Sequence, residues 1–188
     1  AAEGATVVAV ARTQSDLDET VRLIREKGGT ASSLSRDLTC GEQAASMVDS
    51  VLQMYDRIDI LINNAGGYPK EIYEGREHQA IRLWEWSEGS GKIVSVSSRM
   101  GRIASQMGAY SVAKGGIVTM TKTAAIQTQE YGIQVNAVAP GMVDTPGQRV
   151  YNHSVGQDDA VMGSADDVAR AIVYLLCDAP DVMTGQCI

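Results

Sequence analysis

Continuous apolar runs alternate with amphipathic segments along this chain, and this alternation is the feature that most limits its fold. Residues 6–11 read TVVAVA, an unbroken apolar run that is typical of a strand covered on both faces. The segment after it has helical spacing, with Ser15 as the expected cap and Gly28-Gly29 as the expected stop. Helices that cross over between parallel strands produce this order, so we predict an α/β fold.

The same order continues to the end of the chain. Further strands are expected at 30–38, 58–62, 93–96 and 133–139, with the strand at 58–62 strongly buried, and further helices at 42–55, at 110–130 and after Ser164, their cap. The inward faces of the helices are expected to carry Leu17, Val21 and Ile24; Ala45, Val48, Val51 and Leu52; and Val168, Ile172 and Leu175. No repeat or break in composition marks a second domain. We therefore predict a single domain over residues 1–188, built around one open sheet.

The composition excludes several classes of protein. The chain has 188 residues, 44% hydrophobic and 21% charged, as in a globular domain with one core. It contains no run of the roughly 18 apolar residues that span a membrane. A net charge of −7 and scattered basic residues argue against nucleic acid as a partner. Cys40, Cys177 and Cys187 lack metal-ligand spacing and follow no leader sequence, so we expect no metal and a cytoplasmic location.

Small and polar residues follow three of the expected strands. The strand at 58–62 runs into residues 63–67 (NNAGG), the strand at 93–96 into 97–101 (SSRMG), and the strand at 133–139 into Pro140-Gly141. Each of these segments alone could be a turn that needs glycine or proline. In open α/β sheets, however, ligands lie beyond the carboxyl ends of the strands, and three such ends together favour a ligand site.

Tyr110 and Lys114 lie four residues apart near the start of an expected helix, so their side chains leave the same face one turn apart. A tyrosine phenol has an ordinary pKa of about 10, and a cation beside it favours the phenolate. Such a tyrosine is a workable general acid or base nearer neutral pH, and a serine hydroxyl close by can hold the carbonyl oxygen. The spacing alone is weak evidence, because chance also supplies it.

The order of these motifs resembles that of the short-chain dehydrogenase/reductase family. The matching segments are Asn63-Asn64-Ala65-Gly66, Ser98, Tyr110-Ser111-Val112-Ala113-Lys114 and Asn136-Ala137-Val138-Ala139-Pro140-Gly141. The resemblance extends from Ala1 to Gln186, with an interruption between Gly67 and Ser90. It implies a Rossmann-type, doubly wound parallel sheet and an enzyme that transfers a hydride between a nicotinamide cofactor and a carbonyl or alcohol substrate.

The same resemblance implies a role for each matching residue. Tyr110 would donate or accept the proton, Lys114 would lower the pKa of Tyr110 and bind the nicotinamide ribose, and a serine would polarise the substrate carbonyl. Asn64, Ala65 and Gly66 would line the adenosine side of the cofactor, Asp37 and Leu38 would flank the adenine, and Pro140, Gly141, Val143 and Thr145 would contact the nicotinamide end. Family members commonly form homodimers or homotetramers, so the resemblance also implies a homo-oligomer.

Two serines compete for the role at the substrate carbonyl. Ser98 stands three residues before Gly101, as the family serine does, whereas Ser97 has the commoner distance to Tyr110. Adjacent residues of a strand face opposite ways, so only one of the two can point at the substrate. We favour Ser98.

The residues after the first strand indicate which cofactor is used. Enzymes of this fold that bind NAD usually carry an acidic residue there, which binds the ribose hydroxyls. This chain instead reads Val10-Ala11-Arg12-Thr13, and Arg12 offers a planar, charged donor set for a phosphate. We therefore predict NADP, with Arg12 as a surface residue the alternative.

The chain also departs from the family pattern. Family members open with a strand, a glycine-rich turn and a helix that receives the pyrophosphate, and nothing of that kind precedes Ala1. The interval from Gly67 to Ser90 is about half the family's usual length and lacks the asparagine that helps to hold the lysine. We expect the chain to be part of a longer protein, and residues 1–188 alone to bind NADP very weakly.

Two functions are compatible with these observations. The first is an active carbonyl reductase or alcohol dehydrogenase. The second is a non-catalytic relative that keeps the fold for association, through the helix that starts at Tyr110 and the helix after Ser164. The substrate is not determined, because 144–163 is polar and offers no evident anchor for a charged group; Tyr151 and His153 are either pocket residues or exposed loop residues.

Overall fold

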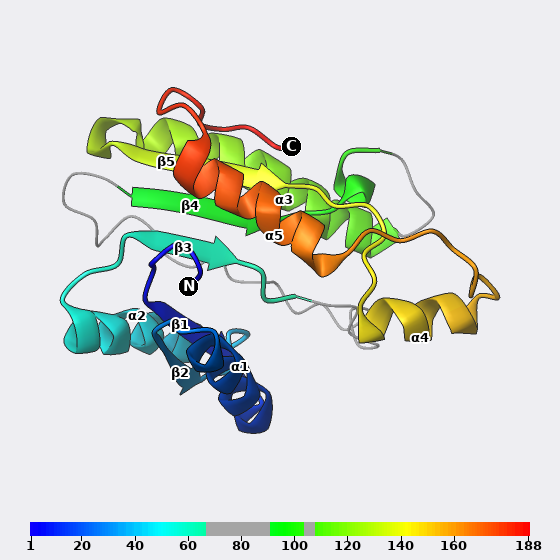
Figure 1. Cartoon of the computed structure of the whole chain (residues 1–188). Helices are drawn as coiled ribbons and strands as arrows, with labels where there is room; N and C mark the ends of the chain where they lie inside the picture. The colour runs from blue at the N-terminus through cyan, green and yellow to red at the C-terminus, as the bar shows by residue number, and fades with distance from the viewer. Residues whose placement is uncertain (67–90, 104–107) are drawn as a thin grey trace. The chain divides into compact units, whose positions relative to one another are not determined.

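The structure, a computed structural model, describes residues 1–66, 91–103 and 108–188 (Figure 1). These residues form two compact units. In the described part of the chain, unit 1 comprises residues 1–58, and unit 2 comprises 59–66, 91–103 and 108–188. Each unit has its own parallel sheet, which confirms the α/β class.

Unit 1 has two strands and two helices, in the order β1 (Val7–Ala11), α1 (Gln14–Glu26), β2 (Ala31–Ser35) and α2 (Gly41–Tyr55). The strands pair in parallel, from Val7 opposite Ala31 to Ala11 opposite Ser35. Leu17 and Val21 of α1 are buried as expected. The helix ends where Gly28 takes a φ of +80° and the amide of Gly29 donates to the Ile24 carbonyl at 3.0 Å, so the predicted glycine stop is confirmed.

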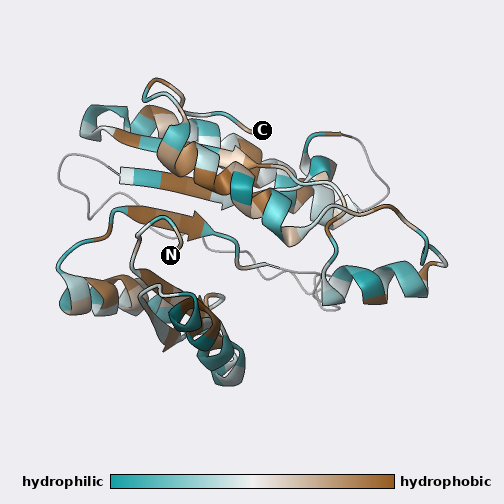
Figure 2. Ribbon diagram, viewed as in Figure 1, coloured by the Kyte–Doolittle hydropathy of each residue, from teal (hydrophilic) through white to brown (hydrophobic). Residues whose placement is uncertain are grey.

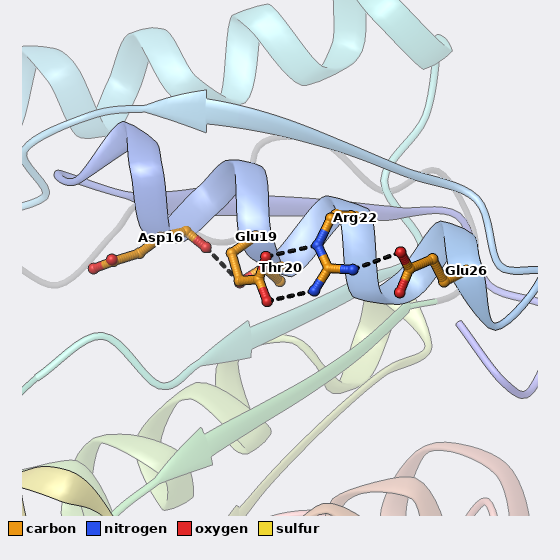
Figure 3. Close-up of polar contacts among 5 residues, drawn as sticks. All are labelled: Asp16, Glu19, Thr20, Arg22 and Glu26. Atoms are coloured by element: carbon orange, nitrogen blue, oxygen red, sulfur yellow. Dashed lines mark hydrogen bonds and ion pairs between the residues drawn. The ribbon is translucent and has the colours of Figure 1, made fainter.

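The outer face of α1 carries a row of polar contacts, shown in Figure 3. The Arg22 guanidinium donates to the carboxylates of Glu19 and Glu26 on either side of it, and the hydroxyl of Thr20 donates to the Asp16 carbonyl. These side chains are exposed, and ion pairs in water add little to stability. The row therefore marks the solvated side of the helix.

Two details of unit 1 differ from the sequence prediction. The cap of α1 is Thr13 rather than Ser15, because the helix begins one residue before Ser15, and Thr13 makes no side-chain cap bond. In α2, Ala44 and Met47 are buried while Ala45 is exposed. The Tyr55 hydroxyl donates to Oγ of Ser32 in β2 at 3.0 Å. Residues 44, 47 and 51 lie on the same face of α2 as Tyr55. With Tyr55 bonded to β2, Ala45 lies off this face and is exposed.

Unit 2 contains a three-stranded parallel sheet in the order β3-β4-β5, formed by β3 (Ile60–Asn63), β4 (Gly91–Val96) and β5 (Ile133–Val138). Three helices accompany it: α3 (Gly108–Gln127), α4 (Pro146–Ser154) and α5 (Ala165–Val173). The last residues of the chain run along β5, where the Ala137 amide donates to the Gln186 carbonyl at 2.8 Å and the Ala139 amide donates to the Ile188 carbonyl at 2.7 Å. Both sides of β5 are thus hydrogen-bonded.

The core of unit 2 lies between the sheet and α5. Val94, Val138 and Leu175 are almost fully buried, and Val168 and Ile172 pack against them, as the helical spacing predicted. Ser164 caps α5 in a capping box with Asp167, which confirms the predicted cap. The helix therefore packs on β4 and β5 through these apolar side chains.

The burial of β3 differs from the prediction. Ile60 and Ile62 of β3 are 38% and 46% exposed, so the expectation of a strongly buried strand was wrong. Ile60 and Ile62 alternate with less exposed residues, so one face of β3 is left uncovered by the described residues, although the strand is as apolar as the middle of β4 (Figure 2). Among the described residues, strand pairing is found within β1-β2 and within β3-β4-β5. No described helix is both long and apolar enough to cross a membrane.

Candidate active site

The carboxyl ends of β3, β4 and β5 meet at one edge of the sheet of unit 2, because the three strands are parallel neighbours. Asn64, Ala65 and Gly66 follow β3, the two serines follow β4, and Pro140 and Gly141 follow β5. Backbone hydrogen bonds join the last two ends: the Ser97 amide donates to the Val138 carbonyl at 2.8 Å, and the Arg99 amide donates to the Pro140 carbonyl at 2.9 Å. The predicted neighbourhood of these strand ends is therefore present.

The two adjacent serines have different surroundings. Ser97 is 3% exposed, and its hydroxyl donates to the backbone carbonyl of Lys114 at 2.7 Å. Ser98 is 9% exposed, and its oxygen accepts from the Met100 amide at 3.2 Å, capping a short 3-10 turn (Arg99–Gly101). The recorded bond of Ser97 uses the hydroxyl proton, whereas that of Ser98 uses only a lone pair. In the described part of the chain, Ser98 therefore keeps its proton for a further acceptor.

Helix α3 supplies the tyrosine and the lysine. The Lys114 ammonium donates to the Val96 carbonyl, in the last residue of β4, at 2.8 Å. It also lies 5.8 Å from the centroid of the Tyr110 ring. Burial lowers the pKa of Lys114 from its ordinary value. The ammonium therefore lies beside the ring whose hydroxyl is the candidate for proton transfer.

Gly101 lets the segment after β4 come into contact with α3. A Cβ at this position would lie 2.5 Å from the carbonyl carbon of Lys114 and 2.7 Å from the Gly115 nitrogen, closer than real Cβ atoms come. Only glycine permits this approach without a shift of the backbone. Gly101 stands three residues after Ser98, so its close approach holds residues 97–101 against the turn of α3 that carries Lys114.

The segment after β5 contains a bridge and a helix. Val143 forms an isolated parallel bridge with Gly163, and the Asp144 amide donates to the Gly163 carbonyl at 2.8 Å. Thr145 caps α4 by accepting from the Gln148 amide at 3.2 Å. This helix was not predicted, although a capping threonine followed by Pro146 is a start signal. Its polar composition concealed it.

The two loop residues considered for a pocket lie in or near the same helix. The His153 ring faces the Asp158 carboxylate, with Nδ1 to Oδ1 at 3.2 Å, and its side chain is exposed. Tyr151 lies in α4 and is half-buried. The described contacts of His153 are those of a surface residue.

The residues predicted for the adenosine side lie partly in unit 1. Arg12 follows β1 and is exposed, and its carbonyl accepts from the Ser35 hydroxyl at 3.1 Å. Asp37 closes a turn by accepting from the amide and the hydroxyl of Thr39 at 3.0 and 2.8 Å, with Leu38 between them. The structure does not place these residues relative to unit 2.

The sequence analysis did not identify Arg36, a second cation at the carboxyl-end edge of the β1-β2 sheet. The Arg36 amide donates to the Ala11 carbonyl at 2.9 Å, so Arg36 directly follows β2, beside the end of β1. The strand pairing that ends with Ala11 opposite Ser35 brings Arg12 and Arg36 to the same sheet edge. The parallel pairing of the two strands was the available signal.

The sheet edge of unit 2 fits the nicotinamide end of such a cofactor. Gly66 and Gly141 leave the backbone bare at the sheet edge of unit 2, and a Cβ on Gly141 would meet no protein atom within 4 Å. A flat ring can therefore approach that backbone closely. In unit 2, Lys114 offers a donor for ribose hydroxyls. In unit 1, taken by itself, Arg12 and Arg36 each offer a cation for a phosphate.

Two family models match the chain. Residues 1–83 match the model described as short chain dehydrogenase, and residues 77–188 match the model described as enoyl-(acyl carrier protein) reductase. The second covers more than half of the chain. The chain belongs to the short-chain dehydrogenase/reductase family. It is therefore an oxidoreductase of the class that acts on alcohol and carbonyl groups with NAD or NADP.

Individual relatives agree with this assignment. The 3-oxoacyl-(acyl-carrier-protein) reductase of Thermotoga maritima is 30% identical, over 100% of this chain and 87% of its own. The actinorhodin polyketide ketoreductase with NADPH has a TM-score of 0.86 at 24% identity and covers 99% of this chain and 86% of its own. The NAD+-bound xylitol dehydrogenase has a TM-score of 0.81 at 23% identity and covers 100% and 88%. At these identities, the two structural likenesses show the Rossmann-type fold alone.

Proposed function

We propose that this protein transfers a hydride between NADP(H) and a carbonyl or alcohol substrate, with Tyr110 as general acid or base. The observation that carries the proposal is the position of the Lys114 ammonium, 5.8 Å from the Tyr110 ring centroid. That ammonium is also anchored to the end of the strand that leads into Ser98. Proton donor, cation and serine therefore belong to one sheet edge and the helix packed on it.

Each residue of this chain has a distinct task in the proposed reaction. In reduction, the Ser98 hydroxyl donates to the substrate carbonyl oxygen and the Tyr110 hydroxyl gives that oxygen its proton; in oxidation the proton moves back to Tyr110. The Lys114 ammonium stabilises the phenolate that remains. When bound, NADP(H) supplies or accepts the hydride.

The remaining predicted residues would bind the cofactor. Asn64, Ala65 and Gly66 would line its adenosine side, with Asp37 and Leu38 beside the adenine, and Pro140, Gly141, Val143 and Thr145 would meet the nicotinamide end. The preference for NADP rests on Arg12 and Arg36, two cations at one sheet edge where enzymes that bind NAD usually carry an acidic residue. Structures of this fold with NAD+ and with NADPH both exist, so the fold alone does not select between them.

A non-catalytic role in association is the second candidate. Val112 and Ile126 of α3 are 76% and 75% exposed, which favours contact with a second copy of the chain. A homo-oligomer is also compatible with catalysis, so only the chemistry separates the two proposals.

The test is transfer of deuterium from NADPH labelled at C4 of the nicotinamide. The full-length protein would be incubated with a panel of ketones, sugars and 3-oxoacyl thioesters, and the products analysed by mass spectrometry. We expect one deuterium on the carbinol carbon of the reduced product, and faster turnover with NADPH than with NADH. Tight NADPH binding without label transfer to any compound would instead favour the association role.

A further inference from the structure

Lys114 is attached to the end of β4 at two separate atoms. Its ammonium donates to the Val96 carbonyl at 2.8 Å, and its backbone carbonyl accepts from the Ser97 hydroxyl at 2.7 Å. The two bonds go to consecutive residues, the last residue of β4 and the first residue after it. Together they fix the position of α3 along the direction of β4, at the helical turn that carries Lys114.

We propose that Ser97 is a positioning residue, whose hydroxyl sets the place of Lys114 and Tyr110 relative to Ser98. The inference rests on the proposed function and assigns Ser97 a task in it. Tyr110 stands one helical turn before Lys114, so a displacement of the α3 backbone at Lys114 moves both side chains. Displacements of about 1 Å at a catalytic group can cost about a hundredfold in rate.

The surroundings of Ser97 favour this task over contact with the substrate. The side chain is 3% exposed, and its one proton is already used in the bond to the Lys114 carbonyl. A backbone carbonyl has two lone pairs, so that of Lys114 can accept from Ser97 in addition to its helical partner. The contact at Gly101 holds the two backbones close, but it is not directional. The hydrogen bond from the Ser97 hydroxyl to the Lys114 carbonyl is directional, so it also orients the two backbones.

The same strand offers a matched control. Ser95 is also 3% exposed and lies two residues before Ser97, so it faces the same side of the sheet. Its oxygen accepts from the Asn63 side-chain amide of β3 at 3.2 Å, a bond in which α3 takes no part. Ser95→Ala and Ser97→Ala therefore remove the same atom at the same burial, and only the second removes a bond to the helix.

The experiment compares Ser97→Ala, Ser95→Ala, Ser98→Ala and Tyr110→Phe in the full-length protein. It measures kcat, KM, NADPH affinity, thermal melts and the pH dependence of alcohol oxidation. Oxidation requires the phenolate, which a well-placed ammonium favours, so a displaced Lys114 moves the rise in rate to higher pH. We expect Ser97→Ala to lower kcat about tenfold, to keep KM within about threefold and to move that rise up by about one pH unit. Ser95→Ala should change neither kcat nor the pH of the rise.

Each other outcome has a definite meaning. Equal effects of Ser95→Ala and Ser97→Ala, or a wild-type pH profile of a folded Ser97→Ala, would overturn the positioning role. A loss larger than that of Ser98→Ala with an unmoved pH profile would make Ser97 the serine at the carbonyl instead. If the alanine variant does not fold, Ser97→Cys keeps the size with a weaker donor and should show a smaller shift of the same sign. Wild-type turnover by Tyr110→Phe would defeat the proposed function itself.

Discussion

The Lys114 ammonium lies 5.8 Å from the centroid of the Tyr110 ring, one helical turn along α3. The spacing of four residues produces this proximity, and the hydrogen bond to Val96 keeps the lysine from turning toward solvent. The ammonium is thus held partly buried, at a measurable electrostatic cost.

Burial of Lys114 makes the free energy of unfolding depend on pH. The folded pKa of Lys114 lies below its ordinary 10.5, so between these two values the unfolded chain binds more protons and stability rises with pH. Lys114→Met removes this contribution. We therefore expect the free energy of unfolding of wild type, minus that of Lys114→Met, to increase as pH rises through the window that ends at 10.5. Urea unfolding at several pH values measures it, with Lys122→Met on the exposed side of α3 as control; a constant difference would contradict the prediction.

Gly101 should tolerate no side chain. An added methyl would meet the Lys114 backbone at 2.5 Å, so Gly101→Ala must push α3 away from the serine segment. We expect a lower melting temperature and at least about a tenfold loss of kcat. Gly116→Ala is the control, because a Cβ there meets nothing within 4 Å, and alanine in a helix should stabilise by about 1 kcal/mol. Equal melting temperatures for both variants would refute the close contact.

Arg12→Asp tests the choice of cofactor. The change replaces a partner for the 2′-phosphate by a charge that repels it, so NADP should bind at least about tenfold more weakly relative to NAD. Lys27→Asp, an exposed charge reversal at the end of α1, should leave the ratio unchanged. Calorimetric titration with both cofactors gives the ratio. If Arg12→Asp keeps the wild-type ratio and Arg36→Asp changes it, the phosphate partner is Arg36.

The fold class, and the residues that lie at the sheet edge of the candidate site, could be predicted because both depend on local sequence patterns. The apolar runs marked β1, β3, β4 and β5, the strand at 30–38 was expected on a weaker pattern, and Ser164 marked the start of α5. The positions of the small and polar residues then followed from the rule that parallel strands end at one edge.

Other features depended on contacts that no local pattern contains. The Tyr55 hydroxyl of α2 meets Ser32 of β2, and the face of β3 that carries Ile60 is left uncovered by the described residues. The different surroundings of Ser97 and Ser98 became visible only with the packing of Lys114 on β4. The sequence left these serines as alternatives because Ser98 has the family's spacing to Gly101 and Ser97 has its commoner spacing to Tyr110.

The most direct test of the account is turnover by Tyr110→Phe. The substitution removes the hydroxyl that transfers the proton but keeps the ring beside Lys114, so cofactor binding should survive. Stopped-flow or steady-state NADPH oxidation would be measured with the best carbonyl substrate of the panel, together with calorimetric NADPH binding. We predict a fall in kcat of about a hundredfold to ten-thousandfold, with NADPH affinity within about threefold of wild type. Turnover equal to that of wild type in the folded, NADPH-binding variant would contradict the assignment of Tyr110 as the general acid or base.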